Sequence, residues 1–255
     1  MTAATQGMTG RVVVVTGASR GLGRTMAKTL NAAGATVVAL ARPSAELDSL
    51  PAETGPDTRI VPCDLADPAA VRDSIRQVGE VYGRIDCLVH NAAVASLLKV
   101  EEATAADIER EFGVNLIGPA NVTSAAVPYL RAAGGGDVVF VSSESVNLPF
   151  PFMTLYVASK AGLEGFARGL RNELRPDGTR VSILRVGGME SGTISREWDA
   201  ERMAQFISES TAGGYFHYTG KLFRTESVAQ TLLSLLTLPR DVNLDLVEAR
   251  AAAGI

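Results

Sequence analysis

The sequence predicts an α/β fold in which helices cover both faces of a doubly wound parallel sheet. Short runs rich in valine and isoleucine alternate with longer segments of helical periodicity, and this alternation is typical of repeated βαβ units. The runs are apolar on both faces, as the strands of a parallel sheet between two layers of helices must be. Because crossovers between parallel strands are right-handed, such units build a doubly wound sheet.

Seven runs are predicted to be strands, the last of them short: 12–16, 36–41, 59–63, 85–89, 137–142, 180–184 and 243–249. Five helical stretches lie between or after them, at about 22–33, 68–82, 104–131, 154–174 and 226–237. The stretch 154–174 has an apolar stripe, and the "RPDG" that begins at residue 175 ends it. The glycines 134–136 are predicted to end the helix before them, since a strand follows.

The chain of 255 residues is predicted to form a single domain, 1–255, because no linker, charge block or repeat precedes residue 185. Residues 186–224 depart from the βα rhythm and predict a helix-containing insertion over the carboxyl edge of the sheet. Seven apolar side chains can either line a substrate pocket there or form the core of a lid, and the sequence leaves both open: Phe150, Phe152, Met153, Trp198, Tyr215, Phe216 and Tyr218.

Composition excludes several classes of protein. Hydrophobic residues make up 46% and charged residues 20% of the chain, as in ordinary soluble globular proteins, and the net charge of −4 argues against a general nucleic-acid binder. No apolar segment reaches the roughly 18 residues of a membrane span, so we expect a cytoplasmic protein. Cys63 and Cys87 follow apolar runs and are expected to be reduced core thiols. With His90 and His217 as the only histidines, no metal-ligand spacing occurs, and we expect no metal.

The stretch "VVVVTGASRGLGRTMAKTL" runs directly from a predicted strand into a predicted helix through Gly17, Gly21 and Gly23. Glycines in such a turn let the backbone approach a pyrophosphate, and the first N–H groups of the helix donate to it at the positive end of the helix dipole. The spacing is Gly-x-x-x-Gly-x-Gly rather than the common Gly-x-Gly-x-x-Gly. A merely tight βα turn is the alternative interpretation.

With "TGASRGLG" at 16–23, "HNAA" at 90–93, "SS" at 142–143 and "YVASK" at 156–160, the sequence resembles the short-chain dehydrogenase/reductase family across about its whole length. The resemblance implies a Rossmann-like domain of seven parallel strands, a homodimer or homotetramer, and hydride transfer between a nicotinamide cofactor and a small carbonyl or secondary alcohol substrate. The cofactor-binding positions that it implies in the glycine loop are Gly17, Ser19, Arg20, Gly21, Leu22 and Gly23.

Two arginines favour NADP(H) as the cofactor. In dinucleotide folds an acidic residue at the end of the second strand binds the adenosine ribose and repels a 2′-phosphate, but this place is occupied by Ala41. Its neighbour Arg42 and the loop residue Arg20 offer guanidinium groups that suit a phosphate. Two solvated surface arginines are the alternative.

Tyr156 and Lys160 are four residues apart, so on a helix they project from one face with Cβ atoms about 5–6 Å apart. A phenol with a pKa of about 10 is a poor base, and a nearby ammonium favours its phenolate form. The resemblance implies that Tyr156 gives a proton to the carbonyl oxygen and takes it back in alcohol oxidation, while Lys160 also binds the nicotinamide ribose. An ordinary exposed pair is the alternative, but the serine and glycine motifs favour a site.

The resemblance supplies two further catalytic positions. Ser143 lies thirteen residues before Tyr156, and its hydroxyl would bind the carbonyl oxygen, with Ser142 as a rival. Asn115, in "FGVNLIG", would help a water connect Lys160 to solvent. A non-catalytic NADP(H)-binding sensor or regulatory module remains as an alternative function, although a sensor has no need of a proton donor.

The remaining cofactor contacts that the resemblance implies lie at the ends of other strands: Asp64, Leu65, Asn91, Ala92, Gly187, Met189 and Ser191. Asp64 can equally cap a helix. The chain departs from the family pattern at His90 and Ala93, where Asn and Gly are usual, and at Val186, where proline is usual. We expect His90 to be a satisfied side chain at a strand end, and the loop after Val186 to be less restricted without the proline.

Overall fold

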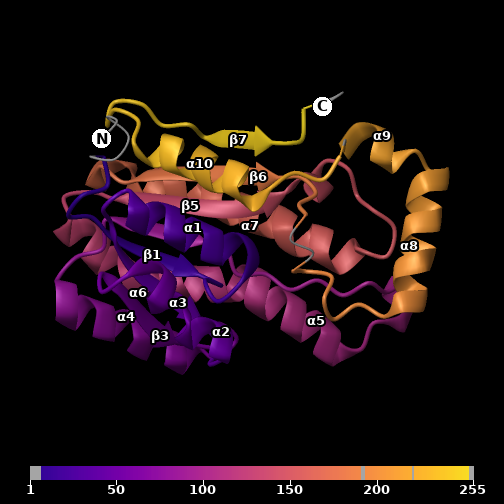
Figure 1. Ribbon diagram of the computed structural model, residues 1–255, viewed down its shortest axis with the longest axis horizontal. Coiled ribbons are helices and arrows are strands. Elements are labelled where there is room, and N and C mark those ends of the chain that lie inside the picture. The colour runs from indigo at the N-terminus through magenta and orange to yellow at the C-terminus, as the bar shows by residue number, and fades with distance from the viewer. Residues whose placement is uncertain (1–6, 191–192, 220, 253–255) are drawn as a thin grey trace.

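A seven-stranded, entirely parallel sheet forms the centre of the computed structural model, which describes residues 7–190, 193–219 and 221–252 (Figure 1). The strands are β1 (Val12–Thr16), β2 (Thr36–Ala41), β3 (Thr58–Pro62), β4 (Cys87–His90), β5 (Asp137–Ser143), β6 (Arg180–Val186) and β7 (Leu246–Ala249). Their order is β3-β2-β1-β4-β5-β6-β7, and every adjacent pair is parallel. The predicted Rossmann-like sheet is therefore confirmed, with its switch point between β1 and β4, where ligands of such sheets bind.

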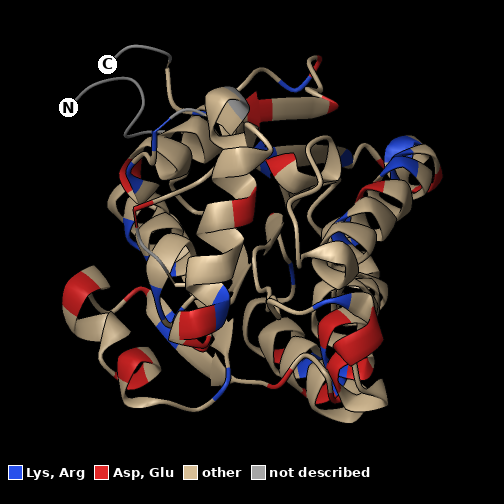
Figure 2. Cartoon of the chain, turned by 90° about the vertical axis from the view of Figure 1, so that its right-hand side faces the viewer, with Lys and Arg blue, Asp and Glu red and all other residues tan. Residues whose placement is uncertain are grey.

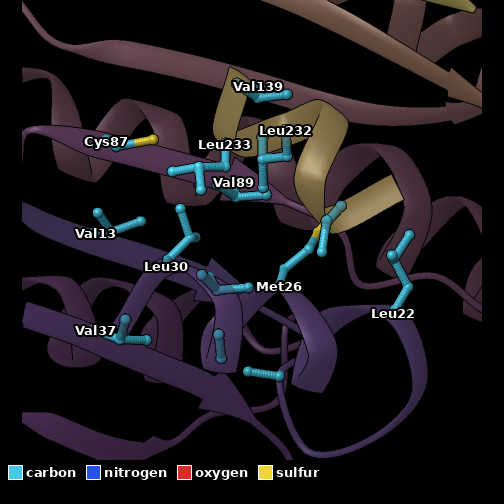
Figure 3. Close-up of a cluster of buried hydrophobic side chains, with 14 of the residues drawn as sticks. Val13, Leu22, Met26, Leu30, Val37, Cys87, Val89, Val139, Leu232 and Leu233 are labelled. Atoms are coloured by element: carbon cyan, nitrogen blue, oxygen red, sulfur yellow. The ribbon is translucent and has the colours of Figure 1, made fainter. Parts of the chain in front are cut away.

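Helices pack on both faces of this sheet. They are α1 (Gly21–Ala32), α2 (Ala45–Asp48), α3 (Leu50–Thr54), α4 (Pro68–Tyr82), α5 (Ala105–Phe112), α6 (Gly118–Ala132), α7 (Thr154–Leu174), α8 (Ala200–Ala212), α9 (Tyr215–Thr219) and α10 (Thr225–Leu236). Apolar side chains of α1 and α10 pack on one face of the sheet, and those of α4, α6 and α7 pack on the other. Figure 3 shows part of the first layer: Val13, Met26, Leu30, Val89, Val139, Leu232 and Leu233.

The helix α7 begins and ends where the sequence predicts. Leu163, Leu170 and Leu174 are buried against the sheet, which gives the helix its tertiary support. The chain leaves the helix through a 3₁₀ turn at Arg175–Asp177, and Gly178 adopts a φ of 72°. Such a left-handed residue after a helix end is readily supplied by glycine. The stop signal in the sequence is therefore sufficient to locate this helix end.

The predicted helix 104–131 is wrong as a single element. The structure divides it into α5, a π-helical segment at Gly113–Ile117, and α6. The wider π turn directs the buried Asn115 side chain toward the loop after β4, where it binds the backbone of Val94. Hydrophobic periodicity continues through the interruption and therefore does not reveal it.

The segment after β6 contains α8 and α9, which lie beyond the carboxyl ends of the strands, at the right of Figure 1. This agrees with a helix-containing insertion at that edge. The helices α2 and α3 between β2 and β3 are not apparent in the sequence, because helices of four or five residues are too short to show periodicity. None of the helices in the described part of the chain is both long and apolar enough to cross a bilayer.

Candidate active site

A cavity of about 1230 Å³ lies at the carboxyl ends of the strands. These strand ends face the viewer in Figure 2. Its wall includes the glycine turn after β1, the ends of β2 to β6, the start of α7 and part of the insertion. The described residues contain no group of three or more His, Cys, Asp or Glu side chains placed to bind a metal ion. The cavity thus occupies the edge of the sheet at which doubly wound folds bind their ligands.

The turn between β1 and α1 requires glycine. Gly17 and Gly21 have positive φ values of 68° and 53°. A Cβ atom on Gly17 would lie 2.8 Å from the Cα atom of Ala92, and one on Gly23 would lie 2.2 Å from the Gly17 carbonyl oxygen. The turn is thus held tightly against the end of β4.

The amino end of α1 has no cap from its N-cap side chain, while Gly21, a predicted cofactor contact, lies next to the Thr193 side chain and is not among the residues that line the cavity. Arg20 occupies the N-cap position with no capping bond from its side chain, and the first turn has no acidic residue. The first N–H groups of the helix and the positive end of its dipole therefore face the cavity that Gly17, Ser19, Arg20, Leu22 and Gly23 line.

Asn91 ties the strands beneath this turn together. Its side-chain amide donates to the carbonyl oxygen of Thr16 at 3.1 Å, and its backbone N–H donates to the Thr16 hydroxyl at 3.0 Å. Asn91, Ala92 and Ala93 all line the cavity. The Nδ2 atom of Asn91 is thus engaged within the protein, and its carbonyl Oδ1 is the atom left to face a ligand.

The side of the cavity next to β2 carries two arginines, Arg20 and Arg42, together with the carboxylate of Glu46. Arg42 is exposed, and its side chain forms no hydrogen bond or ion pair with the described residues. Arg20 lies 3.9 Å from Glu197, a weak and half-exposed pair. Asp64 and Leu65 line the wall after β3. The alternative interpretation of Asp64 as a helix cap is wrong, because Asp67 caps α4 instead.

Ser143, Tyr156 and Lys160 meet on one wall of the cavity. Tyr156 is 7% and Lys160 is 2% exposed, so both are buried in the protein. The Lys160 ammonium donates to the carbonyl oxygen of Val141 at 2.8 Å and lies 5.9 Å from the centre of the Tyr156 ring. An ordinary exposed pair is therefore excluded as an interpretation of this motif.

The neighbouring serines are distinguished by their contacts. The Ser142 hydroxyl donates to the buried carboxylate of Glu164 at 2.7 Å. The Ser143 hydroxyl lies 3.2 Å from the Ser145 N–H and 2.9 Å from the Ser145 hydroxyl. It also faces the Tyr156 phenol, whose pKa it lowers by hydrogen bonding. Ser142 is therefore occupied elsewhere and is no longer a rival to Ser143.

Burial dominates the ionisation of the pair on α7. It raises the pKa of Tyr156 to about 12, although the Ser143 hydroxyl lowers it in part. Burial also lowers the pKa of Lys160 to about 8, although the nearby carboxylate of Glu164 raises it in part. The expectation that the ammonium brings the phenolate toward neutral pH is wrong here. Tyr156 therefore keeps its proton at physiological pH and has one to donate, but the raised pKa makes it a weaker acid than a free phenol.

Asn115 is fully buried behind this wall. Its amide accepts from the Val94 N–H at 2.9 Å and donates to the Val94 carbonyl oxygen at 2.8 Å. It also donates to the Ser159 hydroxyl at 3.0 Å, which in turn donates to the carbonyl oxygen of Tyr156 at 2.8 Å. Asn115 therefore connects the π segment to the loop after β4 and to α7. Its role in a proton relay stays a prediction.

The loop after β6 closes the far side of the cavity. The cavity is lined here by Val186, Gly187, Gly188 and Met189. Met189 also forms an isolated parallel β-bridge with Phe223. The predicted contact Ser191 lies outside the described residues.

The aromatic residues of the insertion pack on one another and also line the cavity. The Phe150 ring lies 5.8 Å from that of Phe206 and 5.5 Å from that of Tyr215. Phe150, Met153, Trp198, Phe206 and Phe216 line the wall. Phe150, Met153, Trp198 and Phe216 thus fit both open interpretations, pocket and lid core. Phe152 and Tyr215 pack against their neighbours but are not among the residues that line the cavity. The side chain of Tyr218 lies outside the described part of the chain.

His90 is only half satisfied. Its Nε2 atom lies 2.8 Å from the Thr123 hydroxyl and its ring stacks on Phe140 at 4.6 Å, but its buried Nδ1 has no partner among the described residues. Burial lowers the pKa of His90 to about 3. The expectation of a satisfied side chain is therefore wrong for one ring nitrogen.

Because the pKa of His90 in the folded protein lies below its value of 6.5 in an unfolded chain, the unfolded state binds the proton first as the pH falls. We expect His90→Asn to reduce the loss of stability between pH 6.5 and pH 5 by up to about 2 kcal/mol. Urea denaturation at both pH values measures this, with the exposed His217→Asn as the matched control. An equal loss in the two variants would contradict a buried neutral His90.

Comparisons with known proteins agree with these features. A family model described as short chain dehydrogenase matches residues 11–202. The chain is 33% identical to L-xylulose reductase of Bos taurus over 231 residues, and this alignment covers 90% of each chain. It is 31% identical over 196 residues to D-threitol dehydrogenase of Mycolicibacterium smegmatis, which covers 76% of this chain and 75% of that one. A solved metagenomic short-chain oxidoreductase in complex with NADP has a TM-score of 0.80 at 26% identity, over 97% of this chain and 99% of that one. The chain belongs to the short-chain dehydrogenase/reductase family.

Proposed function

We propose that the protein is an NADP(H)-dependent oxidoreductase that interconverts a carbonyl compound and a secondary alcohol. One observation supports this above all. A neutral phenol on Tyr156, a hydroxyl on Ser143 and an ammonium on Lys160 line the same cavity as the glycine turn at the amino end of α1. A proton donor and an anion-binding helix end in one cavity are what a nicotinamide-dependent reduction requires.

The residues of the wall fit a dinucleotide. Gly17 and Gly23 let the turn pack tightly, since a Cβ atom at either position would collide with Ala92 or with the Gly17 carbonyl oxygen. The amino end of α1, which the N-cap side chain leaves uncapped, suits a pyrophosphate. Arg20 and Arg42 would bind a 2′-phosphate, and the segment Gly187–Met189 would contact the nicotinamide. When bound, the nicotinamide supplies or accepts the hydride.

The protein's own groups handle the proton. In the direction of reduction, the Tyr156 hydroxyl donates its proton to the oxygen of the substrate, whose negative charge grows in the transition state. The Ser143 hydroxyl stabilises the same oxygen by a hydrogen bond. Lys160, 5.9 Å from the phenol ring, then faces the phenolate that forms and stabilises its charge.

The substrate class follows from the lining of the insertion side. Two of the relatives are named for L-xylulose and D-threitol, which are rich in hydroxyl groups. Here, however, Phe150, Met153, Trp198, Phe206 and Phe216 form an apolar part of the wall that offers few partners to hydroxyls, next to the polar side chains of Thr193, Ser195 and Lys221. We therefore propose that small ketones or aldehydes with an apolar substituent are better substrates than free ketoses.

The test is a kinetic panel. Consumption of NADPH by the purified protein, followed by the absorbance of the reduced nicotinamide, is compared across ketoses, alkyl and aryl ketones, diketones and aldehydes. Apolar ketones are expected to give the highest kcat/KM, and a preference for ketoses would overturn the proposed substrate class. Tight binding of NADPH with no turnover on any compound would favour the sensor.

Arg42→Ala is expected to weaken NADPH binding by about 1.5–3 kcal/mol, because a hydrogen bond to a charged phosphate is lost. NADH binding, which lacks that phosphate, should change little. Isothermal titration with both nucleotides measures the difference. Arg72→Ala on the exposed face of α4 is the control, and an unchanged affinity for NADPH would remove Arg42 from the phosphate site.

We also propose that copies of the chain associate through α5, α6 and α7, as the family resemblance implies. Ile108 on α5 and Ile117 in the π segment are 41% and 52% exposed, which leaves apolar surface for a partner. Sedimentation velocity of the protein and of an Ile108→Glu, Ile117→Glu variant tests this.

A further inference from the structure

Glu144 is a buried carboxylate immediately after Ser143, and the proposed reaction gives it no role. It is 4% exposed and lies in the wall of the cavity. Its Oε1 atom accepts a hydrogen bond from the N–H of Gly188 at 3.1 Å, whereas Oε2 is buried without a hydrogen-bond partner among the described residues. Burying a carboxylate costs free energy unless it is paired. The burial of this carboxylate beside Ser143 therefore needs a reason.

The loop that Glu144 contacts is flexible by composition. Val186 stands where the family usually has a proline, and Gly187 and Gly188 follow it. Two glycines without a proline leave the backbone more conformations to lose on ordering. A Cβ atom on Gly187 would lie 3.1 Å from Oε2 of Glu144, so this loop packs directly on the carboxyl group.

On the outer side of the loop, the hydrogen bonds between described residues join backbone groups. The N–H of Gly187 donates to the carbonyl oxygen of Ala249 at 2.9 Å, and the Gly188 carbonyl oxygen accepts from Phe223 at 3.2 Å. On the inner side, toward the cavity, the described hydrogen bond is the one from Gly188 to Glu144. The carboxyl group is therefore the inner support of this segment.

Arg250 supports the carboxyl group in turn. Its Nε atom lies 3.6 Å from Oε2 of Glu144 and donates to Oε1 of Glu248 at 2.9 Å. Glu248 also accepts from Arg185 at 3.4 Å. Arg185 in turn donates to both oxygens of Glu164, at 2.9 and 2.7 Å, on the helix of Tyr156 and Lys160. A row of alternating charges thus runs from α7 across β6 and β7 to Glu144.

We infer that Glu144, supported by Arg250, is a positioning residue that fixes the segment Gly187–Met189 for the nicotinamide half of the cofactor. The inference rests on the proposed function, since it requires a dinucleotide in the cavity. The side-chain bond to Gly188 supplies the restriction that the usual proline would supply through its ring. The adenine half, bound at the opposite side of the cavity near Arg20 and Arg42, does not depend on Glu144.

The test separates the two halves of the cofactor. NADPH and adenosine 2′,5′-bisphosphate, which has the adenine half without the nicotinamide, are titrated into wild type, Glu144→Ala, Glu144→Gln and Arg250→Ala. Glu173→Gln, which removes a carboxylate from the exposed side of α7, is the charge control. All titrations use the full chain, and thermal unfolding verifies that each variant is folded.

Glu144→Ala is expected to weaken NADPH about ten-fold and to leave the bisphosphate within about two-fold of wild type, as the loss of one hydrogen bond to a charged group predicts. Glu144→Gln retains an acceptor for Gly188 but loses the charge, so its effect should be smaller and similar to that of Arg250→Ala. If Glu144→Ala does not fold, the ratio of NADPH affinity to bisphosphate affinity is measured in Glu144→Gln and Arg250→Ala instead, and it tests the inference in the same way.

Three outcomes overturn the inference. Unchanged affinities for both ligands in the folded variants show that Glu144 does not act on the nicotinamide half. Equal weakening of both ligands shows a general structural role. If wild type binds neither NADPH nor NADH, the proposed function fails together with the inference. If wild type binds NADH in place of NADPH, the same ratio is measured with NADH and AMP.

Discussion

Replacing Tyr156 by phenylalanine is expected to lower kcat by about 10²–10⁴-fold, the contribution of a positioned general acid, while NADPH affinity stays near that of wild type. The variant removes one hydroxyl and no ring, so the packing of the ring with Phe152, Met153 and Leu97 is retained. The remaining groups cannot replace the donor easily. The Ser143 hydroxyl has a far higher intrinsic pKa, and the Lys160 ammonium is bound to the Val141 carbonyl oxygen.

The measurement is single-turnover oxidation of NADPH with the best substrate of the panel. Tyr82→Phe on α4, which removes a phenol hydroxyl far from the cavity, is the matched control and should retain full turnover. A loss of turnover with an equal loss of NADPH binding would indicate a disturbed cavity rather than a missing proton donor.

Turnover retained in Tyr156→Phe would identify another donor, and Glu111 is the first to test. This carboxyl on α5 is fully buried, accepts from the Ser96 N–H at 3.3 Å, and has a second oxygen without a partner among the described residues. Burial raises its pKa to about 7, so it is partly protonated at neutral pH. The double variant with Glu111→Gln would then abolish the remaining activity.

The parts of the site that the sequence predicts are those fixed by the backbone. A glycine turn at the end of a strand must face the carboxyl edge of the sheet, and residues four apart on α7 must share one face. Gly17 can therefore be placed at this edge, and Tyr156 and Lys160 on one face of α7, from the sequence alone. That they share one site is what the family resemblance implies. The strands are predictable for a similar reason, since burial on both faces leaves an apolar run of the correct length.

What the sequence does not show depends on burial and on contacts distant along the chain. The ammonium next to the phenol suggests an acidic tyrosine, but the pKa of Tyr156 depends more on how deeply the fold buries it. Ser142 and Ser143 are adjacent in sequence, and only the approach of Glu164 distinguishes them. The sequence does not indicate that Phe206 lines the cavity, because Phe206 lies on a helix in a segment without a βα rhythm. Glu144 gives none because its partners Gly188 and Arg250 are remote in sequence.

Replacing Asp137 by alanine is expected to lower the free energy of unfolding by about 3–5 kcal/mol, as for the loss of one partner of a buried ion pair. Asp137 begins β5 and is 1% exposed. Its carboxylate accepts from Arg180 at 2.6 Å and from Arg240 at 3.0 Å, and its other oxygen is paired with Arg11. These arginines come from the start of β6, the loop before β7 and the residue before β1. One carboxylate therefore joins three parts of the chain at the amino ends of the strands.

The cost of the Asp137 change arises from the arginines left behind. Arg180 is only 8% exposed, so its guanidinium has little access to water. Its Nη2 atom has no hydrogen-bond partner among the described residues even in the wild-type structure. Without Asp137, its charge would remain buried and uncompensated. Urea denaturation with an unchanged m-value measures the loss. The control is Asp177→Ala, which removes the partner of the exposed Arg131 and should cost at most about 1 kcal/mol.

The two ends of the sheet should respond independently to this change. Asp137 lies at the amino ends of the strands and the cavity at their carboxyl ends, so the folded fraction of Asp137→Ala should bind NADPH as wild type does. If Asp137→Ala costs no more than Asp177→Ala, the three arginines reach water when their partner is removed, and the pairing contributes little to stability. If NADPH affinity falls as well, then the amino ends of β5 and β6 determine where Ser143 and Gly187 stand at the other end of the same strands.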